Sequence, residues 1–168
     1  IDLNGESVII GTKANPFKGK FDGKGAKITN YALTVSGNKQ GLFGVVSGGE
    51  VRDFTVSGTI TVNNVYTNIG GAVGNAKGGA LISGIVSDVN ISGSGAAKHV
   101  GGVLGSSEGL GGTLTVEKCI YNGTVNLPNV SDCLGGVVGY ANEFVTISHC
   151  GFIGSVTGQK GGYVGGIR

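Results

Sequence analysis

Apolar and polar side chains alternate along four short segments of the chain. Each segment is numbered from its first apolar residue, which is Val51, Ile82, Val116 or Ile147. Positions +3, +5, +7 and +9 are then mostly apolar or glycine, and positions +8 and +10 are always small and polar. The polar set is Thr59 and Thr61, Asn90 and Ser92, Thr124 and Asn126, Ser155 and Thr157. A period of two with one apolar face predicts half-buried β-strands.

A glycine tetrad, Gly-x-x-Gly, recurs in step with these segments. Its glycines are Gly41 and Gly44, Gly71 and Gly74, Gly102 and Gly105, Gly136 and Gly139. A fifth copy opens at Gly166, and successive starts are 30, 31, 34 and 30 residues apart. The longer step comes from residues 106–115, between a tetrad and its strand, and repeat proteins tolerate insertions at such loops.

One coil per repeat accounts for this pattern, because equivalent residues would stack as ladders from coil to coil. We therefore predict an all-β, right-handed parallel β-helix, a solenoid of four to five coils with 30–34 residues in each. A propeller blade is the alternative, but it needs four strands and usually a longer repeat. Residues 41–168 form the repeats, starting near 41, 71, 102, 136 and 166. Residues 1–40 do not repeat and are expected to be an N-terminal cap or an irregular first coil of the same domain.

The composition agrees with strands and sets limits on function. The chain has 36 glycines among 168 residues, a mean hydropathy of +0.22 and few charged residues (13%). Disordered chains have low hydropathy and high net charge, so disorder is not expected. A net charge of +2 is too small to indicate a nucleic-acid partner, and no apolar run is long enough for a membrane span.

The tetrads resemble the GLUG-type repeats of bacteria, named for Gly-Leu-x-Gly, and Gly41-Leu42-Phe43-Gly44 is the copy most similar to that motif. The opening, with Asn15-Pro16-Phe17 and Phe21-Asp22-Gly23, is similar to the segment that often precedes such repeats. GLUG repeats occur in large secreted or surface proteins, including adhesin-like proteins and some immunoglobulin A-cleaving metallopeptidases. The resemblance therefore implies a secreted or cell-surface location in a bacterium. Because the sequence stops within a further copy, we expect a segment of a longer protein.

Two of the three cysteines share one repeat position. Cys119 and Cys150 are both at +3 and 31 residues apart, so they are expected to be neighbours on adjacent coils. They could form a disulfide or half of a metal site, but small buried apolar residues are the favoured interpretation. Cys133 precedes the Gly135-Gly136 pair and has no cysteine at its equivalent positions. Since close Cys-x-x-Cys spacing is absent, no metal ligand is predicted.

No catalytic group emerges from the remaining residues. His99 and His149 occupy unrelated repeat positions, which does not favour a shared metal or base role. Carboxylate catalysis requires two acids held close together, whereas Asp53, Asp88 and Glu117 lie at different strand positions. The chain is therefore predicted to be no enzyme and to need no cofactor.

The expected role is structural, as a stalk or spacer, or adhesive, through an exposed face or loops. Partners would be a host glycan, a host protein or other domains of the parent chain. The alternatives are a carbohydrate-active β-helix enzyme and a substrate-docking module of a secreted protease. The polar ladder at +8 and +10 is the most regular exposed feature, although it is also what the outer face of a β-helix ordinarily looks like. Asn-x-Ser/Thr sequons at Asn90, Asn122 and Asn129 matter only in a host that glycosylates secreted proteins.

Overall fold

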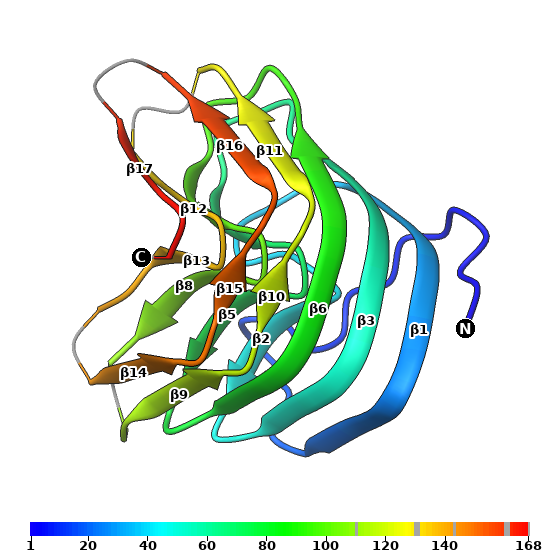
Figure 1. Cartoon of the computed structure of the whole chain (residues 1–168), viewed down its shortest axis with the longest axis vertical. Coiled ribbons are helices and arrows are strands. Elements are labelled where there is room, and N and C mark those ends of the chain that lie inside the picture. Colours follow the sequence, from blue (N-terminus) through cyan, green and yellow to red (C-terminus); the bar gives the residue numbers. More distant parts are fainter. Residues whose placement is uncertain (110, 130–131, 143, 160–161, 168) are drawn as a thin grey trace.

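The chain forms a parallel β-solenoid of about five turns with about 31 residues per turn (Figure 1). A computed structural model describes residues 1–109, 111–129, 132–142, 144–159 and 162–167. Three sheets run along the solenoid, and every strand pairing between coils is parallel. The fold predicted from the repeat is thus confirmed, while its right-handedness stays a prediction.

The largest sheet contains the alternating segments. Its strands are β1 (Lys20–Thr34), β3 (Glu50–Thr61), β6 (Leu81–Ser92), β9 (Leu114–Glu117), β10 (Ile120–Tyr121), β11 (Thr124–Leu127), β14 (Val145–Ser148), β15 (Gly151–Phe152) and β16 (Ser155–Gly158). The long strands β1, β3 and β6 bend strongly along their length (Figure 1). In the next two coils, three short strands follow one another in place of a single long one.

A left-handed backbone residue recurs at one position of this sheet. Asp53, Gly84, Lys118 and His149 have φ values of 56°, 62°, 53° and 52°. They are equivalent residues of consecutive coils, since the pairings on either side of them are continuous. A single residue in this conformation interrupts the strand alternation, so every coil bends at the same place.

Two four-stranded sheets complete each turn. One contains β4 (Thr67–Gly70), β7 (Lys98–Gly101), β12 (Cys133–Gly135) and β17 (Tyr163–Gly165). The other contains β2 (Phe43–Ser47), β5 (Val73–Lys77), β8 (Leu104–Glu108) and β13 (Val138–Tyr140). In the repeats that begin at 71, 102 and 136, the first tetrad glycine lies in the corner between these two sheets.

The inward residues of the largest sheet stack in register. Ile60 pairs with Ile91, Ile91 with Val125, and Val125 with Val156. Phe54 pairs with Ile85, and the same alignment continues through Cys119 to Cys150. Such ladders build one continuous apolar core, which runs from Ile28 to Val138.

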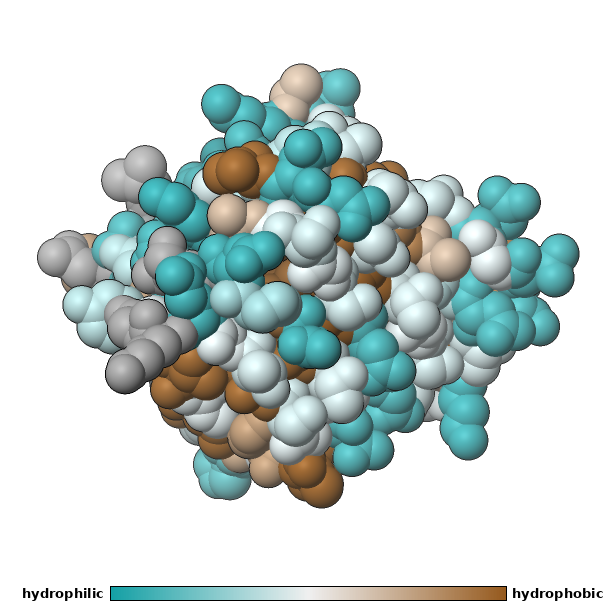
Figure 2. Space-filling view, turned by 90° about the horizontal axis from the view of Figure 1, so that it is seen from above, coloured by the Kyte–Doolittle hydropathy of each residue, from teal (hydrophilic) through white to brown (hydrophobic). Residues whose placement is uncertain are grey.

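The last coil is less covered than the others. Within the described part of the chain, β14 to β17 have a strand partner on one side only, and the inward residues Cys150, Phe152 and Val156 are half-buried. Exposed apolar side chains gather in the same region: Phe144, Ile153, Tyr163, Val164 and Ile167. Seen from above, most of the surface is hydrophilic or near neutral, and the largest group of apolar atoms lies at the lower left (Figure 2).

Residues before the first tetrad pair with the coil that follows them. Ile10 and Phe17 form parallel bridges to Phe43 and Val46, and β1 runs beside β3 over its whole length. The register between β1 and β3 shifts twice, so this first turn is irregular. Its aromatic residues Phe17 and Phe21 pack edge-to-face against Phe43 and help to fill the core. Among the described residues, no helix could cross a membrane.

Candidate functional site

The tetrad glycines lie where neighbouring coils approach closely. All eight are buried. A Cβ added to Gly71 would collide with the carbonyl oxygen of Gly102, and one on Gly102 would collide with that of Gly136. The second glycines, at 74, 105 and 139, would each meet backbone atoms of the preceding coil at 2.5–2.6 Å. Since non-bonded carbon atoms prefer about 3.5–4.0 Å, only glycine fits these positions without movement.

The first tetrad glycines Gly71, Gly102 and Gly136 form a glycine column, and two aromatic rings fill the interior opposite it. Tyr121 lies against Gly102, and Phe152 lies against Gly136. The two rings are parallel within 8°, with centroids 6.1 Å apart. Ser87 faces Gly71 at the equivalent place, one coil earlier. The glycines therefore serve the packing of the interior, and they offer no phosphate-binding loop.

Cys119 and Cys150 are neighbours on adjacent coils, and both thiols are free. They donate to the backbone carbonyls of Glu117 and Ser148, at 3.2 and 3.3 Å. The interaction between the two neighbouring thiols, together with burial, raises the pKa of Cys119, and the same interaction lowers the pKa of Cys150.

The three strand carboxylates are not gathered into one site. Asp53 lies 3.9 Å from the guanidinium of Arg52. Glu117 accepts a hydrogen bond from Ser83, and Asp88 lies on β6 beside Ser57 of β3. Each acid occupies a different position along the coil, as the sequence predicted.

The polar ladder lies on the outer face of the largest sheet. Asn90, Ser92, Thr124, Asn126, Ser155 and Thr157 are all exposed. Thr124 donates to the side-chain oxygen of Asn90 at 2.9 Å, which links two coils. A cross-strand hydrogen bond of this kind helps to stabilise an exposed sheet face.

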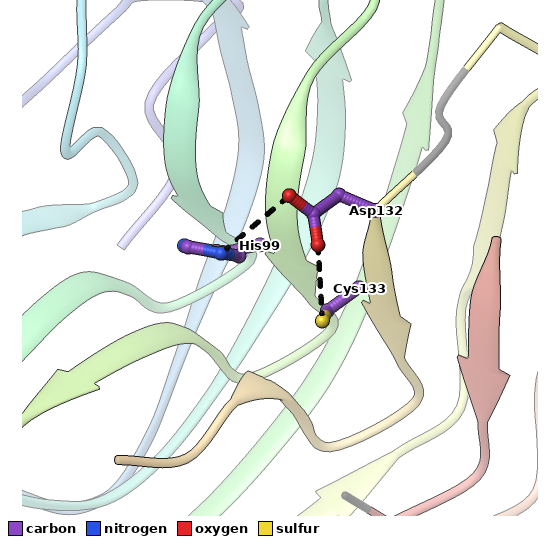
Figure 3. Close-up of side chains that lie close together, drawn as sticks. All are labelled: His99, Asp132 and Cys133. Carbon is purple, nitrogen blue, oxygen red and sulfur yellow. Dashed lines mark hydrogen bonds and ion pairs between the residues drawn. The ribbon is translucent and has the colours of Figure 1, made fainter.

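Three residues that the sequence analysis left apart meet at the start of β7 and β12. His99, Asp132 and Cys133 place their donor atoms within 4.8 Å of one another, the one such group of three that the described part of the chain contains. Figure 3 shows the three side chains converging from two adjacent coils. His99 Nε2 lies 3.9 Å from Asp132 Oδ2, and the Cys133 thiol donates to Asp132 Oδ1 at 3.3 Å.

Contacts from two further strands hold the imidazole of His99 in place. Its Nδ1 lies 3.0 Å from the side-chain oxygen of Asn68 in β4. Tyr140 of β13 stacks on the ring at a centroid distance of 4.4 Å. Burial lowers the pKa of His99, and the nearby charge of Asp132 opposes this shift. The ring is therefore fixed in orientation and only partly exposed, at 26%.

Sequence reasoning compared cysteine with cysteine and histidine with histidine, and therefore missed this group. Counting back from the glycine column would have revealed it. Three residues before Gly71, Gly102, Gly136 and Gly166 stand Asn68, His99, Cys133 and Tyr163. The spacing thus indicated that His99 and Cys133 are neighbours on adjacent coils. It did not indicate that Asp132 lies beside them.

The chain was compared with protein-family models, curated proteins and solved structures, and none of them matches. The molecule is a β-solenoid protein on the evidence of its own fold.

Proposed function

We propose that this chain is a non-catalytic structural or adhesive segment of a secreted or surface bacterial protein, of the GLUG-repeat type. Two features support the proposal: the Gly-x-x-Gly tetrads and the stacked coils. The GLUG assignment itself rests on the tetrads and on the residues that precede them.

One observation carries the proposal most directly, the uninterrupted packing from coil to coil. Ile60, Ile91 and Val125 are buried in consecutive turns, and each contributes about 1.5–3 kcal/mol through burial. Every turn thereby supports its two neighbours, and a solenoid of such turns makes a stiff spacer. An adhesive role would use the same stiffness to present the outer polar ladder.

The carbohydrate-active alternative needs two carboxylates on either side of a scissile bond. Arg52 and Ser83, which lie beside Asp53 and Glu117, give these acids ordinary structural partners. A hollow of about 320 Å³ is lined by residues that include Asn4, Asn30, Tyr31 and Thr59, and its lining contains no acidic residue. These features favour the non-catalytic proposal.

The test is an activity screen of the purified chain on polysaccharide and protein substrates, with product formation as the readout. We expect no turnover. Turnover that disappears in Asp53→Asn, Asp88→Asn or Glu117→Gln would refute the proposal, provided that the variant keeps its circular dichroism spectrum.

A binding assay separates the adhesive role from the spacer role. The labelled chain is applied to immobilised glycans and extracellular-matrix proteins, beside a variant with Thr124→Lys and Asn126→Lys on the outer face. Binding that the double variant loses indicates adhesion through the ladder. Equal binding of both proteins indicates adhesion through another surface, and absent binding of both indicates a spacer.

A further inference from the structure

We propose that His99, Asp132 and Cys133 form a binding site for a divalent transition-metal ion, with Zn²⁺ as the ion best suited to them. The site would join β7 to β12 and so cross-link two coils. It goes beyond the proposed role of the chain, and a spacer without any metal would leave that role intact.

The combination of donors selects the ion. The three residues offer one imidazole nitrogen, one carboxylate oxygen and one sulfur atom. Hard ions such as Mg²⁺ and Ca²⁺ prefer all-oxygen sites, whereas Zn²⁺ readily accepts nitrogen, oxygen and sulfur together. The negative charges of a carboxylate and a thiolate would balance the charge of the ion. Three protein ligands leave a fourth tetrahedral position for water.

The present separations are close to those that zinc requires. Bond lengths of about 2.0–2.3 Å in a tetrahedral site put neighbouring ligand atoms about 3.4–3.6 Å apart. Cys133 Sγ lies 3.3 Å from Asp132 Oδ1, and His99 Nε2 lies 3.9 Å from the other carboxylate oxygen, Oδ2. All three ligand atoms lie within 4.8 Å of one another. Side-chain rotations that move these atoms by about 1 Å would bring them to the separations of a tetrahedral zinc site.

The backbone explains how one histidine reaches two consecutive residues of the next coil. The pairing of Val100 with Leu134 sets the register of the two coils, which places His99 level with Cys133 and Lys98 level with Asp132. Neighbouring residues of a regular strand point to opposite faces. His99 has a φ of 53°, which interrupts the alternation and lets its ring face both partners (Figure 3).

The surroundings of the ring direct the correct nitrogen toward the site. An amide oxygen only accepts hydrogen bonds, so the contact with Asn68 Oδ1 places a proton on Nδ1. In the neutral ring, Nε2 then presents its lone pair to Asp132. Histidine ligands of metal ions are held in this way by an acceptor on their other nitrogen. Tyr140, stacked on the ring, limits its rotation.

Lys98 is the group that opposes binding, because its ammonium lies 4.0 Å from Asp132 Oδ2. It is largely exposed and can turn away into solvent. Binding would also displace the thiol proton that Cys133 now shares with Asp132, and this proton would be released to solvent.

The experiment is a zinc titration of the full chain under reducing conditions, in competition with a chromophoric chelator. Co²⁺ serves as a second probe, since a sulfur ligand produces a charge-transfer band and tetrahedral coordination produces intense visible bands. We expect one equivalent of either ion to bind, and we expect zinc to raise the thermal midpoint.

Three variants test the ligands: His99→Asn, Asp132→Asn and Cys133→Ala. Asparagine suits position 99 because Asn68 adopts the same backbone conformation one coil earlier, with a φ of 64°. Each variant should weaken zinc binding at least tenfold, and Cys133→Ala should abolish the charge-transfer band. His149→Asn is the matched control, since His149 also has a left-handed φ and lies outside the group. It should bind zinc normally.

Thermal midpoints measured without metal identify any variant that has lost its fold. For a ligand position where the first variant does not fold, His99→Gln or Cys133→Ser takes its place. The proposal is overturned if the parent chain binds no zinc, or if a folded variant at position 99 or 133 binds it as tightly as the parent.

Discussion

Replacing Gly102 with valine tests the role of the glycine column, because this residue lies directly against a fully buried ring. A Cβ at Gly102 would fall on Cγ and Cδ2 of Tyr121 and on the carbonyl oxygen of Gly136. Neither neighbour can move away without a large cost in free energy. Tyr121 has no exposed surface, and its hydroxyl donates to the carbonyl oxygen of Val89 at 2.9 Å.

The cost of this substitution has two parts. Overpacking a core costs about 1–3 kcal/mol, and a buried hydrogen bond that is broken costs about 1–3 kcal/mol more. A total of about 4 kcal/mol lowers the thermal midpoint of a chain this size by roughly 8–16 °C. Gly136→Val should cost less, because its partner Phe152 lies in the last coil, is half-buried and can swing outward.

Thermal and urea unfolding followed by circular dichroism measure the effect. Thr124→Val is the matched control, a β-branched substitution on the outer face of the neighbouring sheet. It removes only the exposed hydrogen bond to Asn90, so its effect should be about 0.5 kcal/mol. The expected order of destabilisation is Gly102→Val, then Gly136→Val, then Thr124→Val. If Gly102→Val unfolds at the midpoint of the control, the close approach at the glycine column is not what restricts that position.

Three further predictions concern the hydroxyls of Tyr121 and Tyr31 and the thiols of Cys119 and Cys150. Tyr121→Phe should destabilise the protein by about 1 kcal/mol in urea unfolding, because the hydroxyl donates to Val89. Tyr31→Phe should be neutral or slightly stabilising, because the buried Tyr31 hydroxyl has no hydrogen-bond partner among the described residues; equal losses in both variants would contradict this reasoning. In the native protein near neutral pH, iodoacetamide should modify Cys150 before Cys119, since the pKa of Cys150 is lowered, that of Cys119 is raised, and the thiolate is the reactive form. Peptide mass spectrometry over a time course checks the order, and earlier modification of Cys119 would show that the assignment of the two thiols is wrong.

The fold could be predicted from the sequence because the residue pattern that specifies it is local and repeated. The alternation from Phe54 to Ile60 defines an inward face within one strand, and the constant spacing of the tetrads places equal residues on top of one another. A ladder such as Ile60, Ile91 and Val125 follows directly from these two patterns. The reason is physical: every coil must bury the same face against its neighbours, so every coil carries the same pattern.

The bends of the coils and the contacts in the interior could not be predicted from the sequence. Nothing in the identities of Asp53, Lys118 and His149 indicates that all three adopt a left-handed φ. Non-glycine residues enter this conformation only where the surrounding structure requires it, and here the stacked coils require it at one position. The packing of Tyr121 on Gly102 was hidden for a similar reason, since Tyr121 lies in the largest sheet and Gly102 lies in the corner between the other two.

The sequence by itself determined the alternating strands, the length of the coil and the columns of equivalent residues. Only the tertiary structure decided which unlike residues meet across coils. His99 and Cys133 share a repeat position, but Asp132 joins them because the left-handed residue at His99 turns the ring toward Cys133 of β12 and toward Asp132, which precedes this strand. The repeat fixes where backbones lie, whereas one local dihedral angle decides where a side chain points, and that angle is set by packing from the neighbouring coils.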